Sequence, residues 1–224
     1  IGSSVIRLLL NNGGYSVFNV DKLTYAGNFF PGDDFKSNPN YHFYKLDICD
    51  QAQLTSVFEQ CKPNVILHLA AESHVDRSVR DPHPFIQTNI SGTFSLLEVS
   101  RRYYELLNAR EKHRFRFHHV STDEVFGDCN NLPRPAKESH RYAPSSPYAA
   151  SKASADHLVR AWGITFGLPV LVSLCSNNYG PRQFPEKLIP RTIINAIGGR
   201  HIPVYGDGLQ TRDWLFVDDH AIAL

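Results

Sequence analysis

The chain has 224 residues, of which 42% are hydrophobic and 20% charged, and a formal net charge of +1. This composition is typical of a globular protein, and the near-neutral charge favours small-molecule ligands over nucleic acid or a membrane surface. The sequence has no apolar run long enough to span a membrane and no secretory signal, which predicts a cytoplasmic location. Its four cysteines lack metal-ligand spacing, so we expect thiols and no bound metal.

Apolar, β-branched runs alternate with helical patterns along the chain, which predicts an α/β fold with a doubly wound, Rossmann-like parallel sheet. We expect strands at 15–20, 41–46, 65–70, 115–121 and 170–175. Helices are expected at 3–11, 51–60, 85–107, 147–162 and 187–197, and a further helix begins close to residue 224. The Pro-rich, polar stretch 127–146 is typical of a long surface loop.

A dinucleotide site is predicted from residues that follow the strands, because ligands of such sheets bind at the carboxyl ends of the strands. Asp21 follows Gly2 at about the 20-residue spacing at which a carboxylate binds the adenosine ribose, and its charge favours NAD over NADP. Asp47 and Ile48 could bind adenine. Small side chains after the next strand would let a ligand approach the backbone; these residues are Leu69, Ala70 and Ala71. A turn residue at Asp21 and close helix packing at the small residues are the alternatives.

Both ends of the chain fall inside predicted elements, which indicates truncation at both ends. Most of the Gly-rich turn that would precede Asp21 is absent. We therefore expect residues 1–175 to form an NAD-binding Rossmann-like domain without its first strand. The looser, Pro- and Gly-rich residues 176–224 are expected to begin a smaller substrate-binding lobe.

Tyr148 and Lys152 form a Tyr-x-x-x-Lys pair near the start of a predicted helix, which Ser146 and Pro147 begin. Their spacing places both side chains on one helix face. A phenol has a pKa of about 10, so Tyr148 can act as a base only if its anion is stabilised, and Lys152 with a bound nicotinamide could do this. A solvated helix face is the alternative, but the strand that ends at Thr122 supplies a hydroxyl for the same substrate oxygen.

Asp123 and Glu124 follow Thr122 directly, at the predicted ligand-binding edge of the sheet. Two carboxyl groups in different surroundings have pKa values that move apart, which yields one acid and one base. Elimination of water from a sugar needs a base for the proton beside a ketone and an acid for the departing hydroxyl. A solvated acidic turn is the alternative reading.

Together these residues resemble the dTDP-glucose 4,6-dehydratases of the extended short-chain dehydrogenase/reductase family. The resemblance covers nearly the whole chain, and its segments are 21–28, 69–78, 121–128, 145–152, 177–181, 184–190 and 206–213. Tyr-x-x-x-Lys is common to the superfamily, whereas Thr122-Asp123-Glu124 is more specific to dehydration. One departure is Phe126, which stands where Tyr is common.

The resemblance implies an internal redox cycle that converts the sugar to a 4-keto-6-deoxy sugar. Tyr148, assisted by Lys152 and Thr122, takes the proton of the carbon-4 hydroxyl while hydride passes to NAD. Glu124 then acts as the base at carbon 5, Asp123 protonates the hydroxyl that leaves carbon 6, and the hydride returns to carbon 6.

The same resemblance implies two sets of binding residues and a homodimer formed through the helices at 85–107 and 147–162. The NAD contacts, besides Gly2, Tyr148 and Lys152, are Asp21, Lys22, Thr24, Asp47, Ile48, Leu69, Ala70, Ala71, Ser73, Thr88 and Asn178. The substrate contacts, besides the catalytic residues Thr122, Asp123 and Glu124, are Ser73, Asn177, Lys187, Leu188, Pro203, Tyr205 and Arg212. Arg212 offers a planar fork for a diphosphate, and Tyr205 offers a ring for the base or sugar.

Two alternatives remain open at this point. A nucleotide-sugar epimerase or decarboxylase of the same fold would use Tyr148 without elimination, and the adjacent Asp123 and Glu124 argue against it. A non-catalytic NAD-binding protein would not need the set of acid and base groups that the sequence contains.

Overall fold

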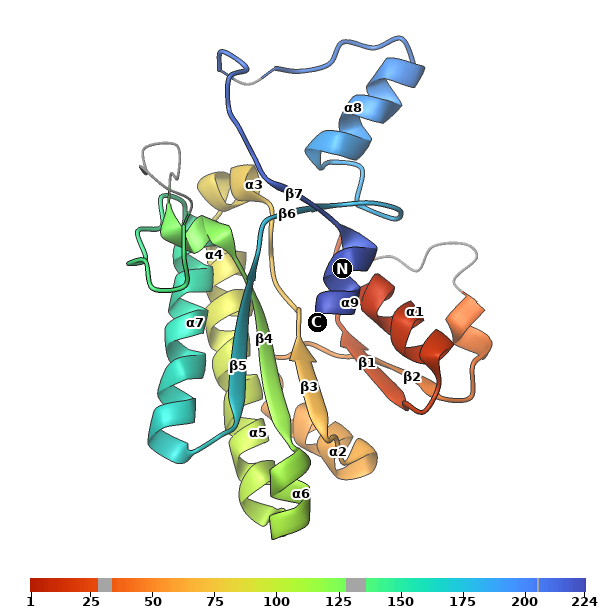
Figure 1. The fold of residues 1–224 in the computed structure, drawn as a ribbon, viewed down its shortest axis with the longest axis vertical. Helices are drawn as coiled ribbons and strands as arrows, with labels where there is room; N and C mark the ends of the chain where they lie inside the picture. Colours follow the sequence, from red (N-terminus) through yellow and green to blue (C-terminus); the bar gives the residue numbers. More distant parts are fainter. Residues whose placement is uncertain (28–33, 128–135, 205) are drawn as a thin grey trace. The chain divides into compact units, whose positions relative to one another are not determined.

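The computed structural model describes residues 1–27, 34–127, 136–204 and 206–224 (Figure 1). They form two compact units: unit 1 contains residues 1–17, 23–41 and 176–224, and unit 2 contains residues 18–22 and 42–175. Among the described residues, no helix has the length and apolar character that a membrane crossing requires.

Strands and helices alternate through most of the chain, as the sequence predicts. The strands are β1 (Val17–Asp21), β2 (Tyr41–Lys45), β3 (Val65–His68), β4 (Arg116–Thr122), β5 (Val170–Cys175), β6 (Asn177–Tyr179) and β7 (Trp214–Phe216). The α-helices are α1 (Gly2–Asn12), α2 (Gln51–Cys61), α3 (Val75–Arg80), α4 (His83–Phe85), α5 (Thr93–Leu106), α6 (Ala109–Arg114), α7 (Pro147–Phe166), α8 (Leu188–Ile197) and α9 (Val217–Ala223). Short 3₁₀ turns lie at η1 (Asp34–Ser37) and η3 (Asp123–Phe126), and η2 (Ile86–Gly92) is a π-helix.

Unit 2 is organised around the parallel strands β3, β4 and β5, in that order across the sheet. In the register, His68 of β3 pairs with His119 of β4, and Thr122 at the end of β4 pairs with Cys175 at the end of β5. Helix α7 packs on β4 and β5 and lies beside α5, which in turn packs on α2 (Figure 1). The carboxyl ends of the three strands therefore meet at one edge of the sheet.

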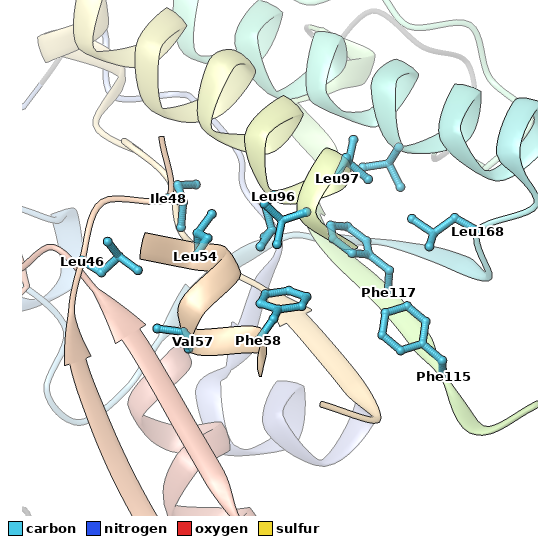
Figure 2. Close-up of a cluster of buried hydrophobic side chains, with 12 residues drawn as sticks. Leu46, Ile48, Leu54, Val57, Phe58, Leu96, Leu97, Phe115, Phe117 and Leu168 are labelled. Atoms are coloured by element: carbon cyan, nitrogen blue, oxygen red, sulfur yellow. The ribbon is translucent and has the colours of Figure 1, made fainter. Parts of the chain in front are cut away.

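The main hydrophobic core of unit 2 joins α2, α5, β4 and α7 (Figure 2). Leu97 of α5 and Phe115 and Phe117 around the start of β4 are completely buried. Burial of a large apolar side chain contributes about 1.5–3 kcal/mol to the free energy of folding. This cluster is therefore a major source of stability for unit 2. A smaller cluster of Val125, Phe126 and Ala153 packs η3 against α7.

Local signals in the sequence explain where α7 begins and ends. The Ser146 side chain accepts a hydrogen bond from the Ala149 N–H at 3.1 Å, and Pro147 occupies the first turn, where its missing N–H costs nothing. Gly167 closes the helix in the left-handed conformation. These caps fix the position of Tyr148 one turn from the sheet edge.

Several predicted elements need correction. The helix expected at 85–107 is divided into α4, the π-helix η2 and α5, because the wider turn of η2 brings Thr88 and Asn89 into the interior. Strand β3 ends at His68, short of the predicted residue 70. The sequence analysis did not predict α3, α6 or the short strands β6 and β7. The loop predicted at 127–146 lies partly outside the described residues, since 128–135 are not described.

Unit 1 contains the parallel pair β6 and β7, the helix pair α1 and α9, and α8. Asn178 of β6 connects to α9 because its Oδ1 lies 2.8 Å from Nδ1 of the buried His220. Helix α8 differs from the other long helices in having no buried residue. Its apolar side chains, such as Ile193 and Ile197, are largely exposed.

Candidate active site

The predicted catalytic residues of unit 2 gather where β4 ends and α7 begins. Thr122 is the last residue of β4, Asp123 and Glu124 form the first turn of η3, and Tyr148 and Lys152 lie on α7. Tyr148, Lys152 and Thr122 are all less than 10% exposed, whereas both carboxyl side chains are half-buried. The structure therefore brings the five residues together as the sequence predicted.

Thr122 connects the acid pair to the tyrosine. Its Oγ1 donates to Asp123 Oδ1 at 3.3 Å, accepts from the Glu124 N–H at 3.3 Å, and its side chain is hydrogen-bonded to the Tyr148 phenol. A hydroxyl has one proton and two lone pairs, so these three contacts use its full capacity. The cap at Thr122 also fixes the direction of η3, which carries both carboxyl groups.

Gly127 ends η3 at a position that other residues would not tolerate. Its φ is +81°, and a Cβ there would collide with the Ala143 carbonyl. Ala143 returns to the same turn, since its N–H donates to the Val125 carbonyl at 2.9 Å. Gly127 and Ala143 stand on either side of residues 128–135, which are not described. The contacts above therefore hold Ala143 against the turn that carries the acid pair.

Tyr148 is protonated in this environment. Burial, and then the negative charge of Glu124, raise the pKa of the phenol above its usual range, while the hydrogen bond with Thr122 acts in the opposite direction. The aromatic ring packs edge-on against Phe85 at a centroid distance of 6.3 Å, which holds it in place. A positive charge added beside the phenol would therefore be needed to make it a base near neutral pH.

Lys152 lies behind Tyr148 with its ammonium group buried. Nζ donates to the Val120 carbonyl at 2.9 Å and lies 3.2 Å from His119 Nε2. Burial lowers the pKa of Lys152 to about 8, against the opposing effect of the Asp156 carboxylate. The hydrogen bonds of the Lys152 ammonium group are with Val120 and His119. Direct stabilisation of a Tyr148 anion by Lys152 therefore stays a prediction.

A second polar group forms near the end of β1. The Lys22 ammonium lies 3.2 Å from Asp47 Oδ2 and 3.3 Å from Thr88 Oγ1, so three of the predicted NAD contacts lie together. Burial acts to raise the pKa of Asp47, but the Cys49 N–H and Lys22 outweigh it, and the pKa is lowered. Asp47 is therefore a carboxylate at neutral pH and can accept hydrogen bonds from a ligand.

The remaining residues of unit 2 that were predicted to contact NAD or substrate differ in their solvent exposure. Asp21 and Ser73 are exposed, and Leu69, Ala70 and Ala71 are half-buried after β3. Ile48 is only 7% exposed and belongs to the hydrophobic core, where it packs against Gly92. Its side chain therefore contributes to packing.

The predicted ligand-binding residues of unit 1 are mostly half-buried or exposed. A Cβ on Gly2 would meet nothing within 4 Å, so packing does not require glycine there. The amide of Asn178 is engaged by Ser176 and His220. Thr24, Asn177, Lys187 and Pro203 are half-buried, and Leu188 and Arg212 are exposed. Tyr205 lies outside the described residues.

The sequence analysis missed three side chains around the site, those of Asn89, His119 and Asp156. The amide of the buried Asn89 bonds both the N–H and the carbonyl of Glu72 and also Ser151 Oγ, which ties the chain after β3 to α7. His119 and Asp156 lie behind Lys152 and are completely buried. A histidine in the middle of the strand that leads to Thr122 and an acid four residues after Lys152 were the signals that could have indicated His119 and Asp156.

The comparisons with known proteins agree with this arrangement. A family profile described as GDP-mannose 4,6 dehydratase matches residues 1–224. The chain belongs to this family.

Members and structural neighbours of the family include dehydratases and epimerases of nucleotide sugars. The chain is 58% identical over 224 residues to the dTDP-glucose 4,6-dehydratase of Neisseria gonorrhoeae, which covers all of this chain and 65% of that protein. A crystal structure of the Bacillus anthracis dTDP-glucose 4,6-dehydratase in complex with NAD is 41% identical, with a TM-score of 0.87 over 99% of this chain and 66% of the other. The Thermotoga maritima UDP-glucose 4-epimerase with UDP-glucose is 31% identical, with a TM-score of 0.85 over 99% of this chain and 68% of the other.

These matches confirm the predicted fold and the resemblance to dTDP-glucose 4,6-dehydratases. The chain spans about 65% of the length of the curated relatives.

Proposed function

We propose that this chain is part of an NAD-dependent hydro-lyase that converts dTDP-glucose to dTDP-4-keto-6-deoxyglucose. The observation that carries the proposal is the hydrogen-bonded group of Thr122, Asp123 and Glu124 against Tyr148. It places one acid pair and one phenol around a single hydroxyl, which is what oxidation followed by elimination requires. The identity to relatives named dTDP-glucose 4,6-dehydratase supports the choice of sugar.

The described residues fit NAD as the cofactor. The half-buried Ala70 and Ala71 leave room for a ligand at the sheet edge, and the cluster of Lys22, Asp47 and Thr88 offers both hydrogen-bond donors and acceptors. The exposed Asp21 carboxylate at the end of β1 suits ribose hydroxyls. When bound, NAD accepts a hydride from carbon 4 of the sugar and later returns it to carbon 6.

Tyr148 begins the reaction by taking the proton of the carbon-4 hydroxyl. The Thr122 hydroxyl assists, because its single proton can turn from Asp123 to the phenolate once Tyr148 has lost its own proton. The carbon-4 ketone then acidifies the proton on carbon 5. Glu124 removes that proton, and Asp123 protonates the hydroxyl that leaves carbon 6, so that water is released. Glu124 would then return its proton to carbon 5 as hydride is delivered to carbon 6, which completes the 4-keto-6-deoxy sugar.

The further site residues are proposed in two groups. For the cofactor they are Gly2, Asp21, Lys22, Thr24, Asp47, Ile48, Leu69, Ala70, Ala71, Ser73, Thr88, Tyr148, Lys152 and Asn178. For the nucleotide sugar they are Ser73, Thr122, Asp123, Glu124, Asn177, Lys187, Leu188, Pro203, Tyr205 and Arg212. Residues 1–175 would then supply the NAD-binding domain and residues 176–224 part of the substrate-binding lobe. We also propose a homodimer and, because both ligands are cytoplasmic metabolites, a cytoplasmic location.

A direct assay tests the proposed activity. The 224-residue chain, and the longer protein if the reading frame continues, are incubated with NAD and dTDP-glucose, and the keto sugar is followed by its absorbance in alkali. The expected product is the 4-keto-6-deoxy sugar. In parallel incubations, conversion of UDP-glucose to UDP-galactose, or formation of a decarboxylated sugar from a nucleotide-activated sugar acid, would instead establish the epimerase or decarboxylase alternative.

The Glu124→Gln variant tests the role of the acid pair. Oxidation at carbon 4 should continue while elimination slows by about 10²-fold or more, because the amide cannot accept the carbon-5 proton. NADH absorbance should therefore build up in a single turnover. If the variant instead releases product at the wild-type rate without NADH accumulation, Glu124 is not the base.

A further inference from the structure

A buried polar network contacts Lys152, and the proposed mechanism does not use it. His119 of β4 and Asp156 of α7 are completely buried. His119 Nε2 lies 3.2 Å from Lys152 Nζ and 3.2 Å from Asp156 Oδ1. One ring nitrogen is therefore the neighbour of both a cation and an anion.

This nitrogen cannot serve both neighbours in a neutral imidazole. If Nε2 carries the proton, it can donate to Asp156 but cannot accept from Lys152; if it is bare, it can accept from Lys152 but cannot donate to Asp156. Among the described residues, neither His119 Nδ1 nor Asp156 Oδ1 has a hydrogen-bond partner. Each arrangement thus leaves a buried polar atom unsatisfied, which is unfavourable in the protein interior. The position of the ring proton must depend on the charge of Lys152.

Asp156 is kept charged by its other oxygen. Oδ2 accepts from Ser121 Oγ and from the Tyr142 phenol, both at 2.9 Å, and Arg160 donates to the same phenol oxygen at 2.8 Å. Burial acts to raise the pKa of Asp156, but His119 and these donors outweigh it, and the pKa is lowered. Asp156 is therefore a buried carboxylate in unit 2. Its second oxygen, Oδ1, lies beside the His119 ring, which in turn contacts Lys152.

We propose that Asp156 is a positioning residue that acts through the His119 ring to hold Lys152 charged and seated on the Val120 carbonyl. An ammonium group without a nearby anion would not remain charged in the interior. The arrangement places the counter-charge on α7, four residues after Lys152, with the His119 ring in contact with both groups. The role of Lys152 in the reaction rests on the proposed function, whereas its link to Asp156 does not.

The other titratable groups around this network can be accounted for. His68 of β3 lies with its ring centroid 5.0 Å from that of His119, and burial lowers the pKa of His68 well below its usual range, so it is neutral. Burial, and then the charge of Lys152, lower the pKa of His119 to about 4, so this ring is also neutral near pH 7. His118 on β4 and Cys175 on β5 also act on the network. Asp156 is therefore the buried anion that balances Lys152.

The proposal is tested by titrating Lys152 directly, without an activity assay. Lysine is labelled with ¹³C at Cε, the Lys152 signal is assigned with Lys152→Met, and its pKa is measured by NMR in wild type and in Asp156→Asn. Loss of the carboxylate should lower the pKa of Lys152 from about 8 by a further unit or more, because burial is then opposed by one charge less. An unchanged pKa in a folded Asp156→Asn protein would overturn the proposal.

Two control variants separate charge from packing. Ser121→Ala removes a donor to Asp156 but keeps the carboxylate, so the pKa of Lys152 should stay near its wild-type value. His119→Gln places an amide that can donate to Asp156 and accept from Lys152 at the same time, and it should also preserve the charged lysine. A shift in Ser121→Ala as large as in Asp156→Asn would show that packing, not charge, is responsible.

The wild-type protein provides a measurement that does not depend on folding of a variant. The His119 ring nitrogens, labelled with ¹⁵N, should change chemical shift at the same pH at which Lys152 loses its proton, because the two sites titrate as one unit. A ring signal that stays constant through that pH would contradict the link. If the NMR shifts occur but no dehydratase activity is found, the network stands and the proposed function fails.

Activity, where it is found, gives a dependent readout. Lys152 is charged below its pKa and loses its proton above it, so hydride transfer in the wild type should decline as pH rises through about 8. In Asp156→Asn the same decline should begin at lower pH, by the shift that the NMR titration measures, while NAD binding at pH 6 is retained. A decline at unchanged pH would contradict the proposed positioning role.

Discussion

Units 1 and 2 differ in how their predicted site residues are held. In unit 2, Tyr148 and Lys152 lie on a capped helix whose other side joins the hydrophobic core, and both are buried. In unit 1, Arg212 and Leu188 are exposed, and α8 has no buried residue. The chemical groups of unit 2 are therefore held in place by packing and hydrogen bonds, whereas an exposed side chain such as Arg212 would be ordered by the proposed ligand.

Tyr148→Phe should have the largest effect and tests whether the proposed chemistry depends on unit 2. The variant removes one hydroxyl from the buried group of unit 2 without altering its packing. We expect hydride transfer to fall by about 10³-fold, measured as NADH formation in a single turnover. NAD binding, measured by calorimetry, should be retained. Tyr103→Phe on α5 removes the same atom from a ring that packs on Phe58 and Phe115, and it should leave the rate unchanged.

A difference in stability between the units is the second prediction. Leu97→Ala removes a completely buried side chain from the core of unit 2 and should lower the free energy of unfolding by about 2–5 kcal/mol. Ile197→Ala removes a side chain of α8 that is 84% exposed and should change it by less than about 0.5 kcal/mol. Urea denaturation followed by circular dichroism measures both. Equal losses would show that α8 is buried in solution.

The smallest expected effect belongs to the exposed residues that we propose as substrate contacts. Arg212→Lys keeps the charge but loses the planar fork, so KM for the nucleotide sugar should rise by about tenfold with little change in kcat. Steady-state kinetics at saturating NAD would measure this change. A fall in kcat with unchanged KM would place Arg212 in the chemical step and weaken the contrast between the two units.

Local signals explain why much of the site could be predicted from the sequence. Ser146 and Pro147 begin a helix by capping rules that require no tertiary information, and a fixed spacing then places Tyr148 and Lys152 on one face. Thr122-Asp123-Glu124 could be located because it directly follows a predicted strand. The alternation of strands and helices likewise indicates the fold without reference to any contact.

The features that escaped prediction depend on contacts between distant segments. His119 meets Lys152 because α7 packs on β4, and His68 meets His119 because β3 and β4 pair in one particular register. The periodicity of a regular helix predicts 3.6 residues per turn, so it could not reveal the π-helix that directs Asn89 toward Glu72 and Ser151. The packing of Ile48 in the hydrophobic core also escaped prediction, because a sequence does not distinguish a pocket wall from a core position.

The saturated hydroxyl of Thr122 limits how this site can change during evolution. Because one oxygen contacts Asp123, the Glu124 backbone and Tyr148, a mutation there would disturb the proposed oxidation and the proposed elimination together. Serine alone could replace threonine and still offer the same donor and lone pairs. New reactions on this scaffold would therefore arise more readily by exchange of the two carboxyl residues than by exchange of the threonine that orients them.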